Sequence, residues 1–437
     1  MINRDAYLTK LINRMNNSMI KVITGIRRCG KSYLLFEIFY SYLLNLNIKQ
    51  DHIIQFSFDN DEDIDKLDSY FPNEETRIKE PNKNFYYINS KKFRAYIKDL
   101  IKDDDNYYIL LDEVQNLDNF SGTLNGFLRH QNMDVYVTGS NAKFLSSDII
   151  TEFRGRGDRI HLSPLSFNEF YNASKLDFNE AWKEYSMYGG MPFLINCKSD
   201  EQKISYLTNL FNETYIKDIV NRNKIRNVTI LEDIINIVSS DIGSFTNPNK
   251  LSNAFASIKK ENVTPNTIKQ YLDYCLDSYL INKALRYDIR GKKYINTPFK
   301  YYFTDIGLRN ARLGFRQQEE KHIMENIIYN ELVNLDYAVD VGVVEISIKN
   351  ENDNYVKKQL EVDFVCNKGY ERYYIQVALN IDTIEKRKQE ENSLLHIKDN
   401  FKKIIIVKSD IKRWKDENGI LFIGLKEFLL DPHCIEN

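Results

Sequence analysis

The chain has 437 residues, of which 43% are hydrophobic and 28% charged, and its formal net charge is −2. This composition excludes a disordered chain, and the length predicts about three domains of ordinary size. The balanced charge excludes a global field that would favour nucleic acid or an anionic membrane, so any polyanion site has to be a local patch.

The N-terminal residues lack the apolar run of a signal peptide, and no stretch of the chain approaches the length of a membrane span. The five cysteines are widely scattered and lack Cys-x-x-Cys spacing, which argues against a disulfide framework or structural zinc. We therefore expect a cytoplasmic protein with reduced thiols and no membrane partner.

The first motif is a complete phosphate-binding loop of the Gly-x-x-x-x-Gly-Lys-Ser type, at residues 25–32. It follows an apolar run at 19–24 and opens a helical pattern at 31–42, which is the strand, loop and helix context that the motif requires. Backbone N–H groups of such a loop wrap phosphates, the lysine reaches the β and γ phosphates, and the serine hydroxyl joins a Mg²⁺ shell. The sequence therefore predicts that ATP and Mg²⁺ bind here, through Gly25, Ile26, Arg27, Arg28, Cys29, Gly30, Lys31, Ser32 and Tyr33.

Strand and helix patterns alternate over the first 165 residues, with apolar strands near 53–58, 107–111 and 135–138. This alternation predicts an α/β layered domain. The polar stretch at 59–89 is interpreted as a surface insertion with some helix, and we prefer a solvated loop over a partner site for its acidic run.

The apolar run at 107–111 ends in Asp112 and Glu113, which is a Walker B pattern. A buried strand of this kind delivers its terminal carboxylates beside the phosphate loop. Asp112 then holds Mg²⁺, directly or through water, and Glu113 polarises the attacking water. An acidic pair at a strand end is also common on surfaces, but the loop upstream favours the functional interpretation.

The next strand, at 134–138, ends in short polar side chains, and Ser140 or Asn141 is a candidate sensor of the γ phosphate. Ordinary turn chemistry is the alternative. Three arginines follow within six residues: Arg154, Arg156 and Arg159. An arginine from this segment can stabilise the charge of the transferring phosphoryl group, in cis or from a neighbouring subunit of a homo-oligomer.

Together with residues 164–167 and the run Tyr188-Gly189-Gly190-Met191-Pro192, these motifs resemble prokaryotic AAA-type ATPases whose C-terminal half is a conserved domain of unknown function. The resemblance spans essentially the whole chain. It implies an α/β fold with an AAA-like parallel P-loop sheet at 1–165, a helical region at 166–225, a winged helix-turn-helix at 226–312 and a PD-(D/E)XK nuclease-like domain at 313–437. The catalytic set is then Glu113, Lys31, Asn141 and Arg156, with Arg154 as second choice for the arginine finger.

The residues themselves also support a winged helix. Helical patterns cover 230–238 and 250–258, Thr264-Pro265 caps a third helix, and a hairpin-like segment follows at 287–294. Double-stranded DNA is a possible partner of this unit, through Lys269, Arg290, Lys292 and Lys293. Solvated cations at a hairpin tip, or a protein contact, are the alternatives.

From about residue 314, the order of helix and strand patterns resembles the restriction-endonuclease-like core. The matches to its metal-binding acids are Glu325 and Asp363, with Gln376 in the third position. Gln376 cannot supply an anionic ligand, and Ala378 replaces the expected catalytic lysine. This possible second metal site is therefore degenerate, and the sequence argues against DNA hydrolysis.

The leading hypothesis is an ATPase that couples ATP hydrolysis to its C-terminal domains, which bind DNA or a protein partner. The alternatives are a nucleotide-switched DNA-binding or interaction protein with little turnover, and an ATP-dependent nuclease that uses Glu325 and Asp363.

Overall fold

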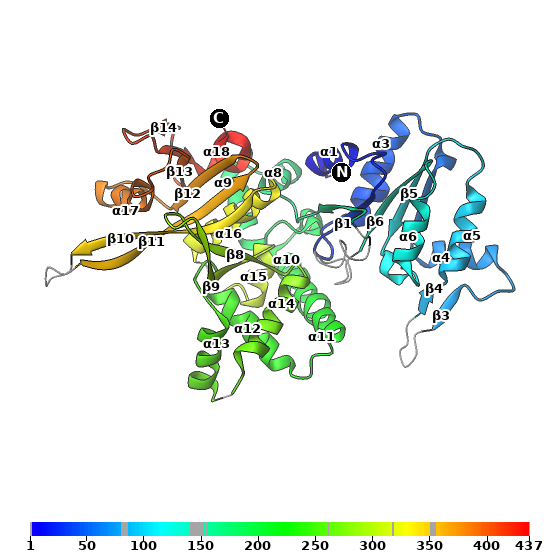
Figure 1. Cartoon of the computed structure of the whole chain (residues 1–437), viewed down its shortest axis with the longest axis horizontal. Coiled ribbons are helices and arrows are strands. Elements are labelled where there is room, and N and C mark those ends of the chain that lie inside the picture. Colours follow the sequence, from blue (N-terminus) through cyan, green and yellow to red (C-terminus); the bar gives the residue numbers. More distant parts are fainter. Residues whose placement is uncertain are drawn as a thin grey trace. The chain divides into compact units, whose positions relative to one another are not determined.

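A computed structural model describes residues 2–79, 86–139, 153, 155–260, 262–316, 319–349 and 355–436. The chain forms two compact units, Met1–Ser163 and Pro164–Asn437 (Figure 1). The first of the expected boundaries, after residue 165, lies two residues from this division. The four-part division of the whole chain stays a prediction.

A five-stranded sheet with the order β2-β5-β6-β1-β7 forms the centre of the N-terminal unit. All neighbouring strands are parallel. Buried residues dominate most of these strands, since both faces of such a sheet are covered, and this explains their continuous apolar runs. The strands are β1 (Ile20–Thr24), β2 (Ile53–Ser57), β5 (Tyr107–Asp112), β6 (Met133–Thr138) and β7 (Gly157–His161).

Helices surround this sheet and pack an apolar core against it. The segment expected to be a surface insertion contains α4, whose first turn is the acidic run. The Asn60 side chain caps α4 by accepting the N–H groups of Glu62 and Asp63. Acidic side chains are favourable at a helix N-terminus, so the run has a structural reason. The remaining elements are α1 (Asp5–Ile12), α2 (Lys31–Tyr33), η1 (Leu34–Phe39), α3 (Tyr40–Asn45), η2 (Gln50–His52), α4 (Asp61–Tyr70), β3 (Arg77–Lys79), β4 (Tyr86–Ile88), α5 (Ser90–Leu100), η3 (Val114–Asn116) and α6 (Phe120–Phe127).

The C-terminal unit begins with helices. Ser166 and Glu169 form a capping box at the first of them, and Thr264 caps α14 as the sequence predicts. The three helices expected for a winged helix are present as α12, α13 and α14. In chain order the elements are α8 (Phe167–Ser174), α9 (Phe178–Tyr188), η5 (Pro192–Asn196), α10 (Asp200–Asn209), η6 (Leu210–Ile216), α11 (Lys217–Asn223), α12 (Val228–Ser240), α13 (Pro248–Ala254), η7 (Phe255–Lys259), α14 (Pro265–Asp277) and α15 (Ile306–Arg312).

The glycine motif at 188–192 has a structural role. The buried carboxylate of Asp305, at the N-cap of α15, accepts the N–H of Gly190 at 2.7 Å. A Cβ on Gly307 would lie 1.8 Å from the backbone oxygen of Tyr188, so only glycine permits this approach. The amide of Asn310 also donates to the last carbonyls of α9. The motif therefore holds α9 against α15.

An eight-stranded sheet with the order β14-β15-β13-β12-β11-β10-β8-β9 completes the C-terminal unit. The hairpin predicted at 287–294 is antiparallel, with Tyr287 opposite Tyr294. It is not a separate wing, because β8 pairs in parallel with β10 and joins this sheet. The elements are β8 (Ile281–Asp288), β9 (Lys293–Phe303), α16 (Glu320–Asn334), β10 (Ala338–Lys349), β11 (Tyr355–Lys368), β12 (Glu371–Ala378), α17 (Ile384–Leu395), β13 (Lys402–Val407), β14 (Trp414–Lys415), β15 (Leu421–Gly424), α18 (Leu425–Leu430) and η8 (Pro432–Ile435).

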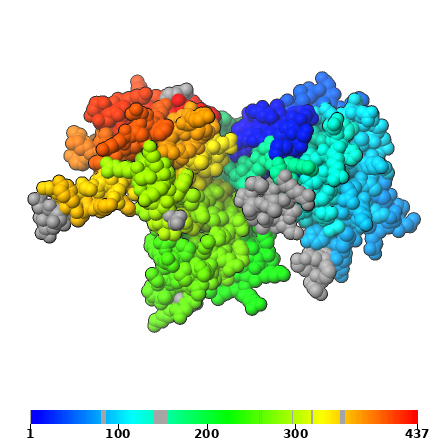
Figure 2. All heavy atoms as spheres, viewed as in Figure 1, coloured from blue at the N-terminus to red at the C-terminus, as the bar shows by residue number. Residues whose placement is uncertain are grey.

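Helix α16 packs on this sheet and links its distant strands. The ring of Tyr329 on α16 stacks on Tyr302 of β9 at 4.2 Å and lies 6.1 Å from Phe364 of β11. The amide of Asn326 pairs with the backbone of Phe303 in both directions. The β10–β11 hairpin extends from this unit as a narrow projection (Figure 2). Over the residues described above, no helix is long and apolar enough to span a membrane.

Candidate nucleotide-binding site

The phosphate loop leaves the C-terminal end of β1 and turns through left-handed backbone conformations. Gly25 has φ of 148° and Gly30 has φ of 99°. A Cβ on Gly25 would lie 2.1 Å from the backbone oxygen of Leu162. The buried thiol of Cys29 donates to the same oxygen at 3.4 Å. The strand β7 and the residues after it therefore set the shape of the loop.

The Lys31 side chain folds back over this loop. Its Nζ lies 3.2 Å from the backbone oxygens of both Gly25 and Ile26, and the residue is buried. A buried ammonium needs acceptors, and here the loop carbonyls supply them. Anionic phosphate oxygens are stronger acceptors for the same ammonium.

The carboxylate of Asp112 lies at the end of β5 and contacts the phosphate loop. It accepts a hydrogen bond from the Thr138 hydroxyl, and the Ser32 hydroxyl lies near it. Burial raises the pKa of Asp112, and the two hydroxyls oppose the shift without cancelling it. Oxygen groups from two motifs about 80 residues apart in the sequence thus meet at one point, and a hard divalent cation prefers such ligands.

Glu113 follows at once and has a positive φ of 51°. Its N–H donates to the Thr138 hydroxyl at 3.2 Å, and the Gln115 amide donates to its carboxylate. Thr138 therefore connects both carboxylate residues of the pair. We expected the γ-phosphate sensor just after Thr138, at Ser140 or Asn141. These two residues lie outside the described part of the chain.

A further carboxylate, Asp59, was missed by the sequence reasoning, which placed it in the surface insertion. The hydroxyl of Ser57, the last residue of β2, donates to Asp59 at 2.6 Å. Its charge also raises the pKa of Asp112, after the larger effect of burial. Its position directly after a strand was the available signal, because parallel strands end at the same edge of a sheet.

Arg156 and Arg159 lie toward opposite ends of the neighbouring strand β1. Arg156 is exposed, and its backbone oxygen accepts the N–H of Ile20 at 2.9 Å, at the start of β1. A five-residue strand spans about 16 Å, so Arg156 lies at the edge opposite the loop and does not reach it in cis. Arg159 instead donates to the Thr24 hydroxyl at 3.2 Å, next to Gly25. Arg154 lies outside the described residues.

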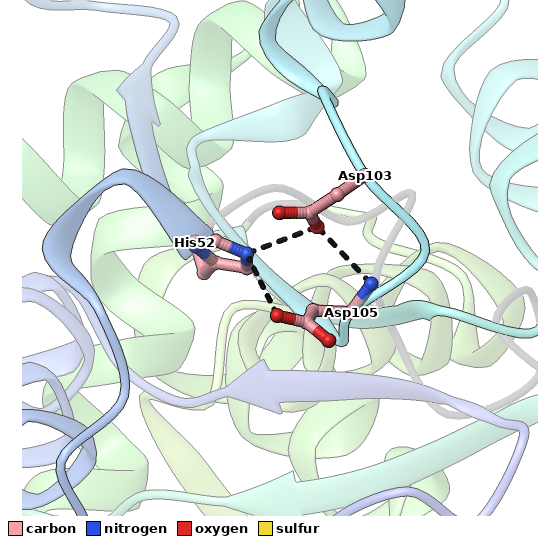
Figure 3. A group of neighbouring side chains, drawn as sticks. All are labelled: His52, Asp103 and Asp105. Carbon is pink, nitrogen blue, oxygen red and sulfur yellow. Dashed lines mark hydrogen bonds and ion pairs between the residues drawn. The ribbon is translucent and has the colours of Figure 1, made fainter.

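The structure also contains a group of metal-ligand side chains that the sequence did not indicate (Figure 3). His52 Nε2 lies 3.1 Å from Asp103 and 3.7 Å from Asp105. The group is at the start of β2 and β5, at the edge opposite the phosphate loop. Hydrogen bonding to Asp51 raises the pKa of His52, burial opposes this shift, and Asp103 adds to the increase. The group therefore links the loops before β2 and β5, away from the phosphate loop.

In the C-terminal unit, the residues matched to nuclease acids lie close to one another. The N–H of Asp363 donates to Gln376 Oε1 at 3.4 Å. Burial and the charge of Glu325 raise the pKa of Asp363 to about 8. Gln376 also accepts from Ser393 and donates to Glu390. Its amide is therefore already engaged with protein groups.

Sequence reasoning missed the cation of this cluster, Lys300 on β9. Its Nζ lies 2.9 Å from Glu325 and 2.6 Å from Glu361. Burial alone would lower the pKa of Lys300, but the charges of the neighbouring carboxylates outweigh burial and raise it. No spacing rule indicates Lys300, because strand pairing and α16 bring it to this place.

The four possible DNA-contacting cations are exposed. Lys269 lies on the outer face of α14, and the other three surround the turn between β8 and β9. Arg290 donates to the backbone oxygen of Glu345 at 2.6 Å. This turn therefore lies beside β10 and at the base of the projecting hairpin.

Residues 17–171 match the model of an AAA domain, and residues 179–319 match a domain of unknown function, DUF8612. An uncharacterized protein of Haemophilus influenzae is 32% identical over 438 residues, covering 98% of this chain and 99% of that protein. An uncharacterized protein of Methanocaldococcus jannaschii, MJ1544, is 26% identical over 404 residues, covering 89% and 80%. The structure of Aeropyrum pernix ORC1 in complex with DNA has a TM-score of 0.32 at 10% identity, covering 72% and 93%.

The parallel sheet, the phosphate loop and the carboxylates at the end of β5 define the N-terminal unit as an AAA-type P-loop domain, the ATP-binding class. The chain as a whole belongs to the same family as the Haemophilus influenzae protein.

Proposed function

We propose that the protein is a Mg²⁺-dependent ATPase. The observation that carries this proposal is that the Asp112 carboxylate at the end of β5 lies beside the phosphate loop, near enough for the Ser32 hydroxyl to lower its pKa. A hydroxyl and a carboxylate are the oxygen ligands that the Mg²⁺ of MgATP prefers, so the residues fit this ion and support the proposal. The AAA domain match over the same segment supports the assignment.

Each residue then has a defined task. Lys31 exchanges the carbonyls of Gly25 and Ile26 for phosphate oxygens. Mg²⁺, when bound, neutralises charge on the phosphoryl group. Glu113 holds the attacking water and accepts its proton, and Thr138 fixes the backbone from which Glu113 projects. Asn141, which lies outside the described residues, remains the proposed sensor.

Phosphate release from MgATP tests this proposal, with nucleotide binding measured separately. Glu113→Gln should retain binding and lose about 10²- to 10⁴-fold in turnover, because general bases contribute this much. Lys31→Ala should lose binding. Glu62→Gln removes an exposed carboxylate from α4 and is the matched control. Wild-type turnover in Glu113→Gln would show that another group activates the water.

The arginine finger is proposed to act between copies of the chain, since Arg156 lies at the far edge of the sheet. Arg156→Ala and Lys31→Ala should each be inactive alone. A mixture of the two should regain part of the activity, because a mixed oligomer contains one intact site. Absence of any recovery in a mixture that does assemble would exclude Arg156 as a finger in trans.

DNA binding by the C-terminal unit is a second candidate function. The exposed cations at the β8–β9 turn favour it. Replacement of Arg290, Lys292 and Lys293 by alanine should weaken binding of double-stranded DNA and reduce its salt dependence. The matched control removes three exposed lysines elsewhere in the unit, Lys388, Lys398 and Lys412. Equal losses in the two triple variants would mean that only total charge matters.

A further inference from the structure

A lysine ammonium lies at the centre of the nuclease-like cluster. The side chains of Lys300 and Glu325 are 3% and 2% exposed, and that of Glu361 is 36% exposed. The two carboxylate oxygens are 2.9 and 2.6 Å from Lys300 Nζ. One cation therefore bridges α16 and β11 from a third element, β9.

Other protein groups also donate hydrogen bonds to the carboxylates of the cluster. The Tyr302 hydroxyl donates to the same Glu325 oxygen at 2.6 Å. Asp363 Oδ2 accepts the N–H of Val377 at 2.8 Å. An acceptor that already receives a donor offers fewer lone pairs to an ion. The hydrogen bonds of the cluster thus fit an ammonium rather than a second ion.

Charge and geometry lead to the same conclusion. A divalent cation that bridges Glu325 and Glu361 would have to occupy the position of Lys300 Nζ, and two cations cannot share it. A buried carboxylate without a cation is costly, so Lys300 has a clear energetic role.

We propose that the ammonium of Lys300 takes the place of the Mg²⁺ that the resemblance to PD-(D/E)XK nucleases implies. The cluster is then a metal-independent ionic centre and not a hydrolytic site. It ties β9 to α16 and β11, and thereby fixes the β8–β9 hairpin with its exposed cations to the body of the unit. This role does not depend on ATP hydrolysis.

The test uses the full chain without nucleotide, and measures bound Mn²⁺ by electron paramagnetic resonance. Wild type should bind no Mn²⁺ at this cluster, and EDTA should not change its unfolding temperature. Lys300→Met should gain one Mn²⁺ per chain, and Mn²⁺ should raise its unfolding temperature by several degrees. The double variant that combines Lys300→Met with Glu325→Gln should lose the gained ion. Lys283→Met, on the neighbouring strand β8, is the control and should gain none.

Two results would overturn the proposal. The first is Mn²⁺ bound to wild type and lost in Glu325→Gln, or Mn²⁺-dependent nicking of plasmid DNA with the same dependence. The second is a folded Lys300→Met that gains no ion. If Lys300→Met does not fold, the comparison of wild type with Glu325→Gln decides, and Lys300→Arg should fold without Mn²⁺ because it retains a cation.

Discussion

Glu331 of α16 provides a quantitative test of the contact between α16 and the start of α8. This carboxyl is buried, and its Oε1 accepts the N–H of Phe167 at 2.7 Å. Burial raises its pKa from 4.5 to about 8, and the hydrogen bond from Phe167 only partly opposes the shift. At neutral pH the folded chain therefore holds Glu331 protonated, whereas the unfolded chain ionises it.

The sign of the effect follows from proton binding. Between pH 4.5 and about 8 the folded state binds one more proton than the unfolded state, so stability falls as pH rises. At about 1.4 kcal/mol per pH unit, the loss across this window is about 5 kcal/mol. Below pH 4.5 both states are protonated and the penalty vanishes.

Glu331→Gln should remove this penalty, because glutamine stays neutral and its oxygen can accept the same N–H. The variant should be more stable than wild type at pH 8 and equal to it at pH 4.5. Both tryptophans, Trp182 and Trp414, lie in the C-terminal unit, so urea unfolding followed by tryptophan fluorescence reports this unit. Glu417→Gln changes a carboxyl that is 81% exposed and is the control. An equal shift at both pH values, or a less stable variant at pH 8, would refute the reasoning.

Three further outcomes are expected. His52 has a raised pKa, so its contribution to stability is complete below pH 6.5 and is lost as pH rises through the folded value; His52→Gln should destabilise the N-terminal unit in calorimetry at pH 5.5 and much less at pH 9. Gly307→Ala should lower the unfolding midpoint strongly or prevent folding, because its Cβ overlaps the Tyr188 carbonyl, whereas unchanged stability would contradict that packing. Thr138→Val removes the hydroxyl shared with Asp112, and should cost about 1 to 3 kcal/mol in denaturant unfolding and slow ATP turnover.

Four strands of the N-terminal sheet could be predicted because each is an apolar run, whereas β7, Gly157–His161, is largely polar and was not predicted. Loop, strand and carboxylates are local signals, and the parallel topology brings them to one edge. Asp59 was missed because the residues after it resemble a polar loop. Arg156 was favoured because a sequence motif shows where a residue lies along the chain, but not at which end of a strand it lies in the fold. The structure settles that point through the pairing of β7 with β1.

The C-terminal elements were also predictable one by one, but their assembly was not. The helices and hairpin fit a winged helix, yet the pairing of β8 with β10 depends on contacts more than 50 residues apart. Lys300 is buried among carboxylates for the same reason. The sequence analysis looked for a lysine at position 378, on β12, and therefore could not find Lys300, which β9 supplies.

The shared sheet limits how the protein can be divided for expression. A fragment that ends at residue 312 keeps β8 but loses β10, and so exposes an unpaired strand edge together with the carboxylate-binding face of Lys300. Open edges of this kind favour aggregation. A fragment that begins at 313 loses the cation and leaves Glu325 buried without it. The cut between Ser163 and Pro164 spares both sheets, so it should yield two pieces that can be purified and studied separately.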